Sequence, residues 1–146
     1  MANLVVHFEI HATEPERAAE FYSTLFGWKI ERYGDLAYWL VDTGDGSIRN
    51  DTAQPGLGIN GGIIQRTQQA PPVGGPVTGA NLVIGVDHVD ASFARALELG
   101  GMDAMAPTDM PGIGRLAYVL DPDNNIFGMI SGTLSDGTDG MTGTGT

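Results

Sequence analysis

Residues 5–22 read "VVHFEIHATEPERAAEFY", a strand-like run followed at once by a helix-like run. The apolar residues at positions 6, 8 and 10 alternate with His7, Glu9 and His11, which is the two-residue period of a strand. One face of this strand is therefore apolar and is expected to pack on the rest of the protein. The other face carries one acid and two imidazoles, so it is a candidate functional surface.

The helix that follows has recognisable start and stop signals. Thr13 with Glu16 three residues later predicts a capping box, and Pro15 suits the first turn, where its missing N–H does no harm. Apolar residues at positions 18, 21, 22 and 25 form the stripe of an amphipathic helix, and Gly27 predicts its end. The stretch thus predicts a strand and a helix that pack through their apolar sides.

The order strand, helix, three strands occurs twice along the chain. "LAYWLVDTGDG" at 36–46 is echoed by "LAYVLDPDNN" at 116–125, and Asp90 is expected to cap the second helix. Between the halves, residues 67–79 contain three prolines, three glycines and no charge, which is typical of a linker. Each half is too small to bury its own sheet, so the halves are expected to pair.

These patterns predict a single domain over residues 1–132, with the following parts: module one 1–66, linker 67–79, module two 80–132, and a flexible Gly/Thr-rich tail at 133–146.

Charge and composition exclude several classes of function. The chain of 146 residues has 7 basic and 18 acidic side chains and a net charge of −11, so nucleic acid is not an expected partner. It has no cysteine and no apolar run of the ~20 residues that span a bilayer. It also opens without a signal-peptide pattern. We therefore expect a cytoplasmic protein that does not bind membranes.

Two βαβββ modules with these signatures resemble the vicinal oxygen chelate superfamily of glyoxalases, bleomycin-resistance proteins and extradiol dioxygenases. The matching stretches are "EPERAAEFYSTLFGW" at 14–28 and "PGIGRLAYVLDPDNNIFGM" at 111–129. The resemblance implies an α+β fold, in which the two modules form a U-shaped mixed sheet around a central cavity with the helices outside. It also implies a small-molecule ligand and a homodimer, with the pocket lying within one chain or between two.

In the metalloenzymes that the chain resembles, one metal is held by the first and last strands of both modules. His7 falls at the first ligand position, but Asn81 stands where His is usual and Gly128 where Glu is usual. Gly62 falls at the matching position of module one. Because a divalent ion needs three or more His or carboxylate ligands, we expect no metal at the family site and no cofactor.

The opening row of polar residues leaves two alternatives. His7 and His11 would lie about 13 Å apart on a strand, too far to share one ion, whereas a metal on His7 and Glu9 is feasible. Alternatively, His7 and Glu9 line a ligand pocket, with Glu9 or His7 acting as a base, or Glu9 only pairs with His7, Asn60 or Asn81. His11 and His88 are expected at the surface.

The aromatic residues complete the candidate site. Tyr38 and Tyr118 occupy equivalent positions in the sequence repeat, with Trp39 on the face opposite Tyr38, and such rings either hold an apolar ligand or pack in the core. Glycines at 62 and 128 are expected to open the pocket floor. The predicted ligand-binding residues are His7, Glu9, Tyr38, Trp39, Asn60, Asn81, Tyr118 and Gly128.

The sequence therefore predicts a metal-independent protein that binds a small aromatic or apolar molecule. The alternative is an enzyme of lyase, isomerase or dioxygenase type, with Glu9 or His7 as base or with a rebuilt metal site.

Overall fold

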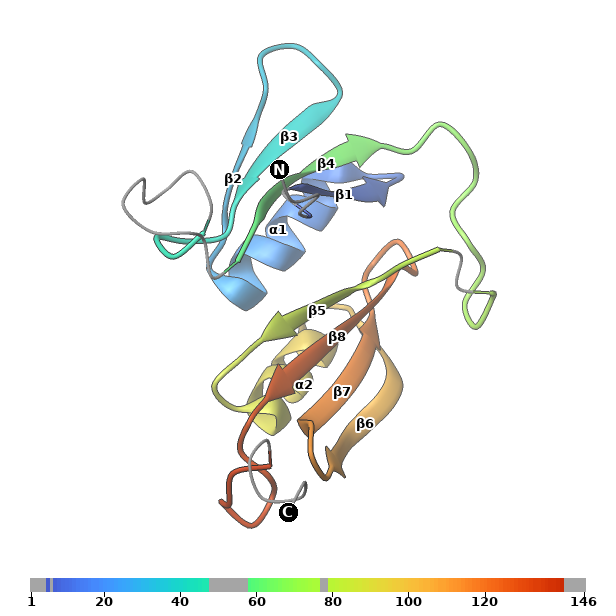
Figure 1. Ribbon diagram of the computed structural model, residues 1–146. Helices are drawn as coiled ribbons and strands as arrows, with labels where there is room; N and C mark the ends of the chain where they lie inside the picture. The colour runs from blue at the N-terminus through green and yellow to red at the C-terminus, as the bar shows by residue number, and fades with distance from the viewer. Residues whose placement is uncertain (1–4, 6, 48–57, 77–78, 141–146) are drawn as a thin grey trace. The chain divides into compact units, whose positions relative to one another are not determined.

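The computed structural model describes residue 5 and residues 7–47, 58–76 and 79–140. The chain divides into two compact units, residues 1–70 and 71–146, and the boundary falls within the stretch that the composition identifies as a linker. Each unit is a four-stranded mixed sheet with one helix packed on it (Figure 1). The α+β class and the two βαβββ modules predicted from the sequence are confirmed.

The first unit has the strand order β1-β4-β3-β2, with β1 parallel to β4 and the other neighbours antiparallel. Its elements are β1 (His7–Ala12), α1 (Pro15–Phe26), β2 (Lys29–Arg32), β3 (Tyr38–Asp42) and β4 (Asn60–Gln65).

The core of the first unit lies between α1 and one face of this sheet. The side chains of β1 alternate strictly between exposed and buried, as the sequence predicts, with Phe8 and Ile10 buried. An aromatic group closes the core: Trp28 stacks on Tyr22 at 5.6 Å between ring centroids and lies 5.8 Å from the ring of Phe8. Burying each of these rings stabilises the unit by roughly 1.5–3 kcal/mol.

The ends of α1 confirm one sequence prediction and correct another. Gly27 is the C-cap, with a left-handed φ of 74° and its N–H bonded to the carbonyl of Ser23 at 2.8 Å. The predicted capping box is wrong, because Glu14 is the N-cap residue and makes no side-chain capping bond. The carbonyl of Thr13 accepts a hydrogen bond from Gln65 Nε2 at 2.7 Å, which holds Thr13 at the end of β4 and starts the helix one residue later.

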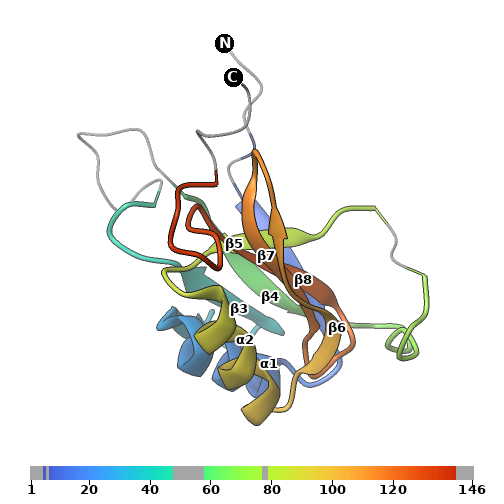
Figure 2. The ribbon, with the colours of Figure 1, turned by 90° about the horizontal axis from the view of Figure 1, so that it is seen from below.

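The second unit repeats the arrangement with the order β5-β8-β7-β6, and β5 runs parallel to β8. Its elements are β5 (Leu82–Gly85), α2 (Val89–Glu98), β6 (Met102–Met110), β7 (Gly114–Leu120) and β8 (Ile126–Ser131). Each helix covers one face of its own sheet (Figure 2). Fully buried residues on the α2 side include Ala117, Val119 and Met129.

Two details of the second unit bear on the sequence predictions. The N-cap of α2 is His88, which is exposed as expected, and Asp90 lies two residues later in the first turn, with its carboxylate bonded to Arg115. The predicted Asp90 cap is therefore wrong, because an arginine competes successfully for that carboxylate. The tight turn after β7 has Asn124 in the left-handed conformation, with φ of 64°, and the buried Asp121 accepts backbone bonds across it.

Beyond β8, residues 132–140 fold into a closed turn. The N–H of Gly140 donates to Gly132 O at 2.7 Å, and the N–H of Gly112 donates to Gly140 O at 2.8 Å, which joins this turn to the β6–β7 hairpin. Residues 141–146 lie outside the described residues, and flexibility of the tail stays a prediction. Among the described residues, neither helix combines the length and the apolarity that a bilayer crossing requires.

Candidate functional site

The face of the first sheet that points away from α1, here called the open face, carries the polar residues of the opening stretch. The strand register aligns Glu9 with Gly62 and then with Leu40, so side chains at these positions share one face. By the same alternation, the open face is formed by His7, Glu9, His11, Tyr38, Leu40, Asn60, Gly62 and Ile64.

Three of these side chains meet in what we call the His7–Glu9–Tyr38 cluster. His7 Nε2 lies 2.7 Å from the Tyr38 hydroxyl oxygen and 3.9 Å from Glu9 Oε2. The His7 and Glu9 side chains are 44% and 43% exposed, so a ligand can reach both. The structure thus places Tyr38 on the open face, one of the two positions that the sequence left possible.

Gly62 is what lets Tyr38 reach this position. A Cβ atom at Gly62 would lie 2.1 Å from the Tyr38 hydroxyl oxygen and 2.2 Å from its Cζ, far inside contact distance. The tyrosine therefore fills the space that a side chain at position 62 would take. The expectation that this glycine opens the floor of a pocket is wrong, because the ring of Tyr38 covers it.

The surroundings of Tyr38 keep its hydroxyl protonated. Burial, then the hydrogen bond to Glu9, and then the negative charge of Glu9 together raise the pKa of Tyr38 to about 12, from an ordinary value of 10.0. At neutral pH the phenol is thus protonated and can donate a hydrogen bond.

Two further predicted residues of this unit serve other contacts. Asn60 Oδ1 accepts hydrogen bonds from the N–H of Thr43 at 2.9 Å and from its hydroxyl at 3.1 Å, so it fixes the turn after β3. Trp39 is only 8% exposed and lies on the α1 side of the sheet, with the guanidinium of Arg32 5.0 Å from the ring centroid. Trp39 thus lies on the face opposite the open face, and the Asn60 amide oxygen is engaged by Thr43.

The second unit also has a tyrosine ring over a glycine, but it lacks side chains equivalent to His7 and Glu9. Tyr118 pairs directly with Gly128, and a Cβ at Gly128 would lie 2.9 Å from the Tyr118 ring. Val83 pairs with Gly128 as Glu9 pairs with Gly62, so a valine replaces the acid.

The register also corrects the apparent equivalence of the two tyrosines. Tyr118 lies directly opposite its glycine, whereas in the first unit Leu40 lies opposite Gly62 and Tyr38 reaches the glycine diagonally from two residues away. The two tyrosines are thus equivalent in the sequence repeat but differ by two residues in their register relative to the glycine.

Comparison with known proteins decides the family. A family model described as "Glyoxalase-like domain" matches residues 6–130. The chain belongs to the glyoxalase-like domain family. It is 26% identical over 125 residues to a protein of Mycobacterium tuberculosis provisionally named glyoxylase CFP32, covering 84% of this chain and 41% of that protein. It is also 31% identical over 93 residues to a glyoxylase-like domain-containing protein of Didymella fabae, covering 64% and 65% of the two chains.

The chain thus spans about two fifths of the length of the mycobacterial relative. Among solved structures, a glyoxalase-related enzyme from Fulvimarina pelagi superposes with a TM-score of 0.65 at 17% identity over 94% of this chain and 97% of that chain. A variant of the fosfomycin resistance protein FosX from Listeria monocytogenes, complexed with Mn(II) and dihydroxypropylphosphonic acid, gives 0.65 at 15% identity over 89% and 90%. At such identities these likenesses show the fold alone.

For this glyoxalase-like protein, the positions that the family resemblance assigns to a metal can now be inspected one by one. His7 offers an imidazole, Gly62 and Gly128 offer no side chain, and the exposed Asn81 donates its amide to the carbonyl of Leu82 at 3.3 Å. Within the described ranges, no group of three or more His, Cys, Asp or Glu side chains is placed to share an ion. The donor set therefore does not fit the metal that the resemblance implies.

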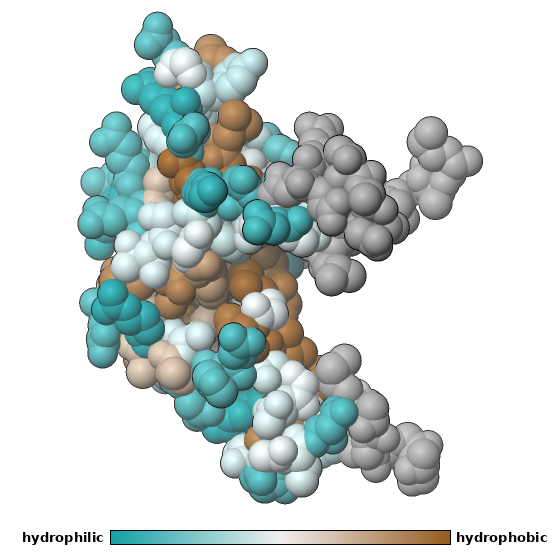
Figure 3. All heavy atoms as spheres, turned by 90° about the vertical axis from the view of Figure 1, so that its left-hand side faces the viewer, coloured by the Kyte–Doolittle hydropathy of each residue, from teal (hydrophilic) through white to brown (hydrophobic). Residues whose placement is uncertain are grey.

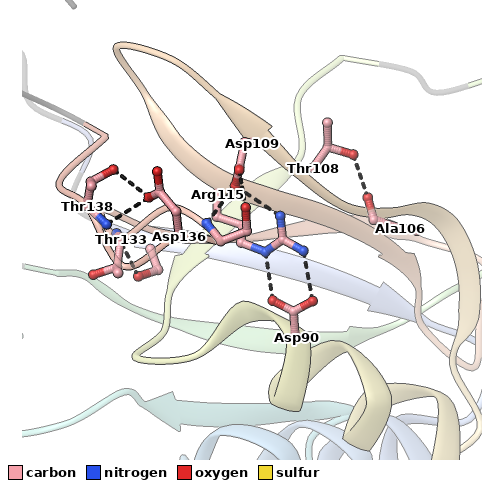
Figure 4. A network of polar contacts seen from close by, with 10 residues as sticks. Asp90, Ala106, Thr108, Asp109, Arg115, Thr133, Asp136 and Thr138 are labelled. Atoms are coloured by element: carbon pink, nitrogen blue, oxygen red, sulfur yellow. Dashed lines mark hydrogen bonds and ion pairs between the residues drawn. The ribbon is translucent and has the colours of Figure 1, made fainter. Parts of the chain in front are cut away.

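A second polar network, in the other unit, is structural rather than ligand-binding (Figure 4). Arg115 donates two hydrogen bonds to Asp90 on α2, at 2.7 and 2.8 Å, and a third to Asp109 on β6, at 2.9 Å. Ser135 then bonds to Asp109, and these contacts lower the pKa of both aspartates. The Arg115 side chain is only 16% exposed, so its donors are taken up in joining α2, the β6–β7 hairpin and the C-terminal turn.

Proposed function

We propose that this glyoxalase-like protein binds a small molecule on the open face of its first sheet without using a metal. In this proposal, the His7–Glu9–Tyr38 cluster fixes a polar group of the ligand. Leu40, which is 46% exposed beside the cluster, contacts an apolar part of it. The single observation that carries the proposal is that the Tyr38 hydroxyl lies against Gly62 and bonds to His7 at 2.7 Å.

The chemistry of the donors supports a metal-free site. His7 and Glu9 are two strong donors, and 3.9 Å between their nearest atoms would let both approach one ion at about 2.0–2.2 Å. A third strong donor is missing from this set, since the described residues contain no group of three or more His, Cys, Asp or Glu side chains placed to share an ion. Two ligands bind a divalent ion weakly, so the cluster is better suited to hydrogen bonding.

The geometry also favours catalysis by a general base as a second candidate function. The Glu9 carboxylate is partly exposed beside His7, so it can accept a proton from a bound molecule. Such an enzyme would be a lyase or an isomerase. Association into a homodimer and residence in the cytoplasm remain expectations.

A thermal-shift screen of metabolites, run with and without EDTA, tests this proposal. We expect ligands that raise Tm equally in both conditions and lose their effect in His7→Ala. His88→Ala is the matched control, since His88 is an exposed histidine of the other unit. The proposal fails if the purified protein carries a stoichiometric divalent metal that His7→Ala releases, or if no ligand depends on His7.

A further inference from the structure

Four dipeptides of this chain are open to the same covalent change, and the fold treats them differently. They are Asp45–Gly46, Asn60–Gly61, Asp136–Gly137 and Asp139–Gly140. In each pair the backbone nitrogen of the glycine can attack the side-chain carbonyl carbon of the preceding residue, because glycine has no side chain to hinder the approach. Hydrophilic side chains cover much of the surface seen in Figure 3, so exposure alone does not single out one pair.

The attack forms a carbon–nitrogen bond and closes a five-membered succinimide ring. The glycine nitrogen loses its proton, and the side chain loses water if it is an aspartate or ammonia if it is an asparagine. Water then opens the ring, and cleavage at the backbone carbonyl gives isoaspartate, in which the main chain runs through the side-chain carboxyl carbon. The reaction therefore needs a glycine N–H without a hydrogen bond and a backbone that can bend toward the side chain.

The asparagine pair has the most reactive sequence, because an amide is a better electrophile than an ionised carboxylate. The fold places it inside β4, where Gly61 pairs with Phe8 on one side and with Val41 on the other. The side-chain oxygen of Asn60 is engaged as well, by the N–H of Thr43 at 2.9 Å. Because the ring cannot close without breaking the pairing of the strand, this pair is protected.

The two pairs of the C-terminal turn are protected by hydrogen bonds of their glycines. The N–H of Gly137 donates to Leu134 O at 2.9 Å, and the N–H of Gly140 donates to Gly132 O at 2.7 Å. Gly140 is also buried. The nitrogen that would attack is thus committed to a carbonyl oxygen in both pairs.

Asp45 and Gly46 are different, because they occupy the two central positions of the turn after β3. The N–H of Ser47 donates to Gly44 O at 3.0 Å, which closes the turn around them and leaves the amide of Gly46 outside this bond. Among the described residues, no backbone carbonyl accepts from Gly46, and no atom lies within 4 Å of the place that its Cβ would take. Both residues are exposed.

We infer that Asp45 is the site at which this protein forms isoaspartate, and that the fold protects the other three pairs. The turn at Asp45 has both of its ends tied, since the hydroxyl groups of Ser47 and Thr43 are hydrogen-bonded and Thr43 in turn bonds to Asn60. Isoaspartate lengthens the backbone between Thr43 and Ser47 by one carbon, so it should loosen this tie. The inference involves no ligand and is independent of the proposed function.

Mass spectrometry of peptides from protein aged in neutral buffer tests the inference, because fragmentation locates isoaspartate residue by residue. In the folded protein, isoaspartate at Asp45 should accumulate roughly tenfold faster than at Asp136 or Asp139, the factor expected for first opening one hydrogen bond. Deamidation of Asn60 should also be slower than the change at Asp45. In protein aged in denaturant, where no pair is protected, Asn60 should become the fastest site.

Two matched variants identify the site. Asp45→Glu should abolish most of the isoaspartate formed by the folded protein, since a glutamate would have to close a less favourable six-membered ring. Asp136→Glu makes the same change in the protected turn and should leave the yield unchanged. Amide exchange at Thr43 should become faster in the aged parent but not in aged Asp45→Glu.

Other rate orders overturn the inference. These are a rate at Asp136 or Asp139 equal to that at Asp45 in the folded protein, faster deamidation of Asn60 than isomerisation of Asp45, or no change at Asp45. Unchanged exchange at Thr43 once Asp45 has isomerised would overturn the predicted loosening of the turn.

Discussion

Replacing Gly62 with alanine should expel Tyr38 from the cluster while leaving every polar group of the site in the protein. The added Cβ would lie 2.1, 2.2 and 2.5 Å from three atoms at the far end of the Tyr38 side chain. These atoms can move by rotation of the ring, whereas the strand backbone cannot move without breaking its pairing. Tyr38 is thus expected to swing away from His7 and Glu9.

The cost can be worked out from the bonds that are lost. The partly exposed hydrogen bond to His7 contributes about 0.5–1 kcal/mol, and lifting the ring off the sheet removes roughly another 1 kcal/mol. Alanine returns about 0.5–1 kcal/mol, because it restricts the unfolded chain more than glycine does. The free energy of unfolding should fall by about 0.5–1.5 kcal/mol, which lowers Tm by roughly 2–6 °C.

The titration of Tyr38 gives a sharper measurement than stability. Its pKa should fall from about 12 toward 10.0 in Gly62→Ala, followed by tyrosine resonances or by phenolate absorbance. Because the folded pKa lies above the unfolded one, the contribution of the neutral phenol is complete below pH 10. That contribution is lost as the pH rises to about 12, and the variant should lack this loss.

Gly128→Ala is the matched control, since the corresponding distance to the Tyr118 ring is a milder 2.9 Å and involves no residue of the cluster. This variant should leave the Tyr38 titration unchanged. The reasoning is refuted if Gly62→Ala retains a Tyr38 pKa of about 12, or if it costs more than ~3 kcal/mol, which would mean that the sheet moves instead of the ring.

Three further predictions concern packing and the second unit. Gly61→Ala places a Cβ 2.5 Å from the carbonyl oxygen of Phe8 on the neighbouring strand, which cannot rotate away. The free energy of unfolding, measured by denaturant titration, should therefore fall by about 3 kcal/mol or more, while the Tyr38 pKa stays unchanged. Arg115→Met leaves Asp90 and Asp109 without their cation and should lower the free energy of unfolding at neutral pH, measured by denaturant titration. The pKa values of both aspartates are lowered in the folded state, so their contribution is present above about pH 3.8 and is lost below it. Acid should therefore destabilise this variant less than it destabilises the parent. Ser135→Ala should lower the free energy of unfolding by less than ~1 kcal/mol, raise the pKa of Asp109 and speed amide exchange in the C-terminal turn. Unchanged exchange would contradict the idea that the Ser135–Asp109 bond holds this turn in place.

The fold was readable because its signals are local and repeated. The period of two in β1 correctly separates the buried Phe8 and Ile10 from the polar face, and Gly27 ends α1 where a left-handed residue is required. The predicted starts of both helices were wrong because tertiary contacts engage the residues that were expected to cap them. Arg115 takes the Asp90 carboxylate from 25 positions away, a pairing that no local pattern reveals.

The candidate site was only partly predictable. His7 and Glu9 could be placed together because neighbours on one strand face share an orientation. The position of Tyr38 beside them depends on the register between β3 and β4, which are distant in sequence. The sequence therefore could not show that the tyrosine-to-glycine register differs by two residues between the two units. The alternation in the sequence correctly placed Trp39 on the face opposite Tyr38. Whether that face lines a pocket or the core could be decided only once the position of α1 was known.

The fit of Tyr38 into the space above Gly62 limits which substitutions position 62 can accept. An acidic residue introduced at position 62, where the family resemblance assigns a metal ligand, would collide with the tyrosine before it could gain an ion. Removing Tyr38 first would dismantle the cluster and leave the bare glycine exposed. Metal binding through position 62 thus needs two coupled changes, each unfavourable alone, and the His7–Glu9–Tyr38 arrangement resists single substitutions toward it.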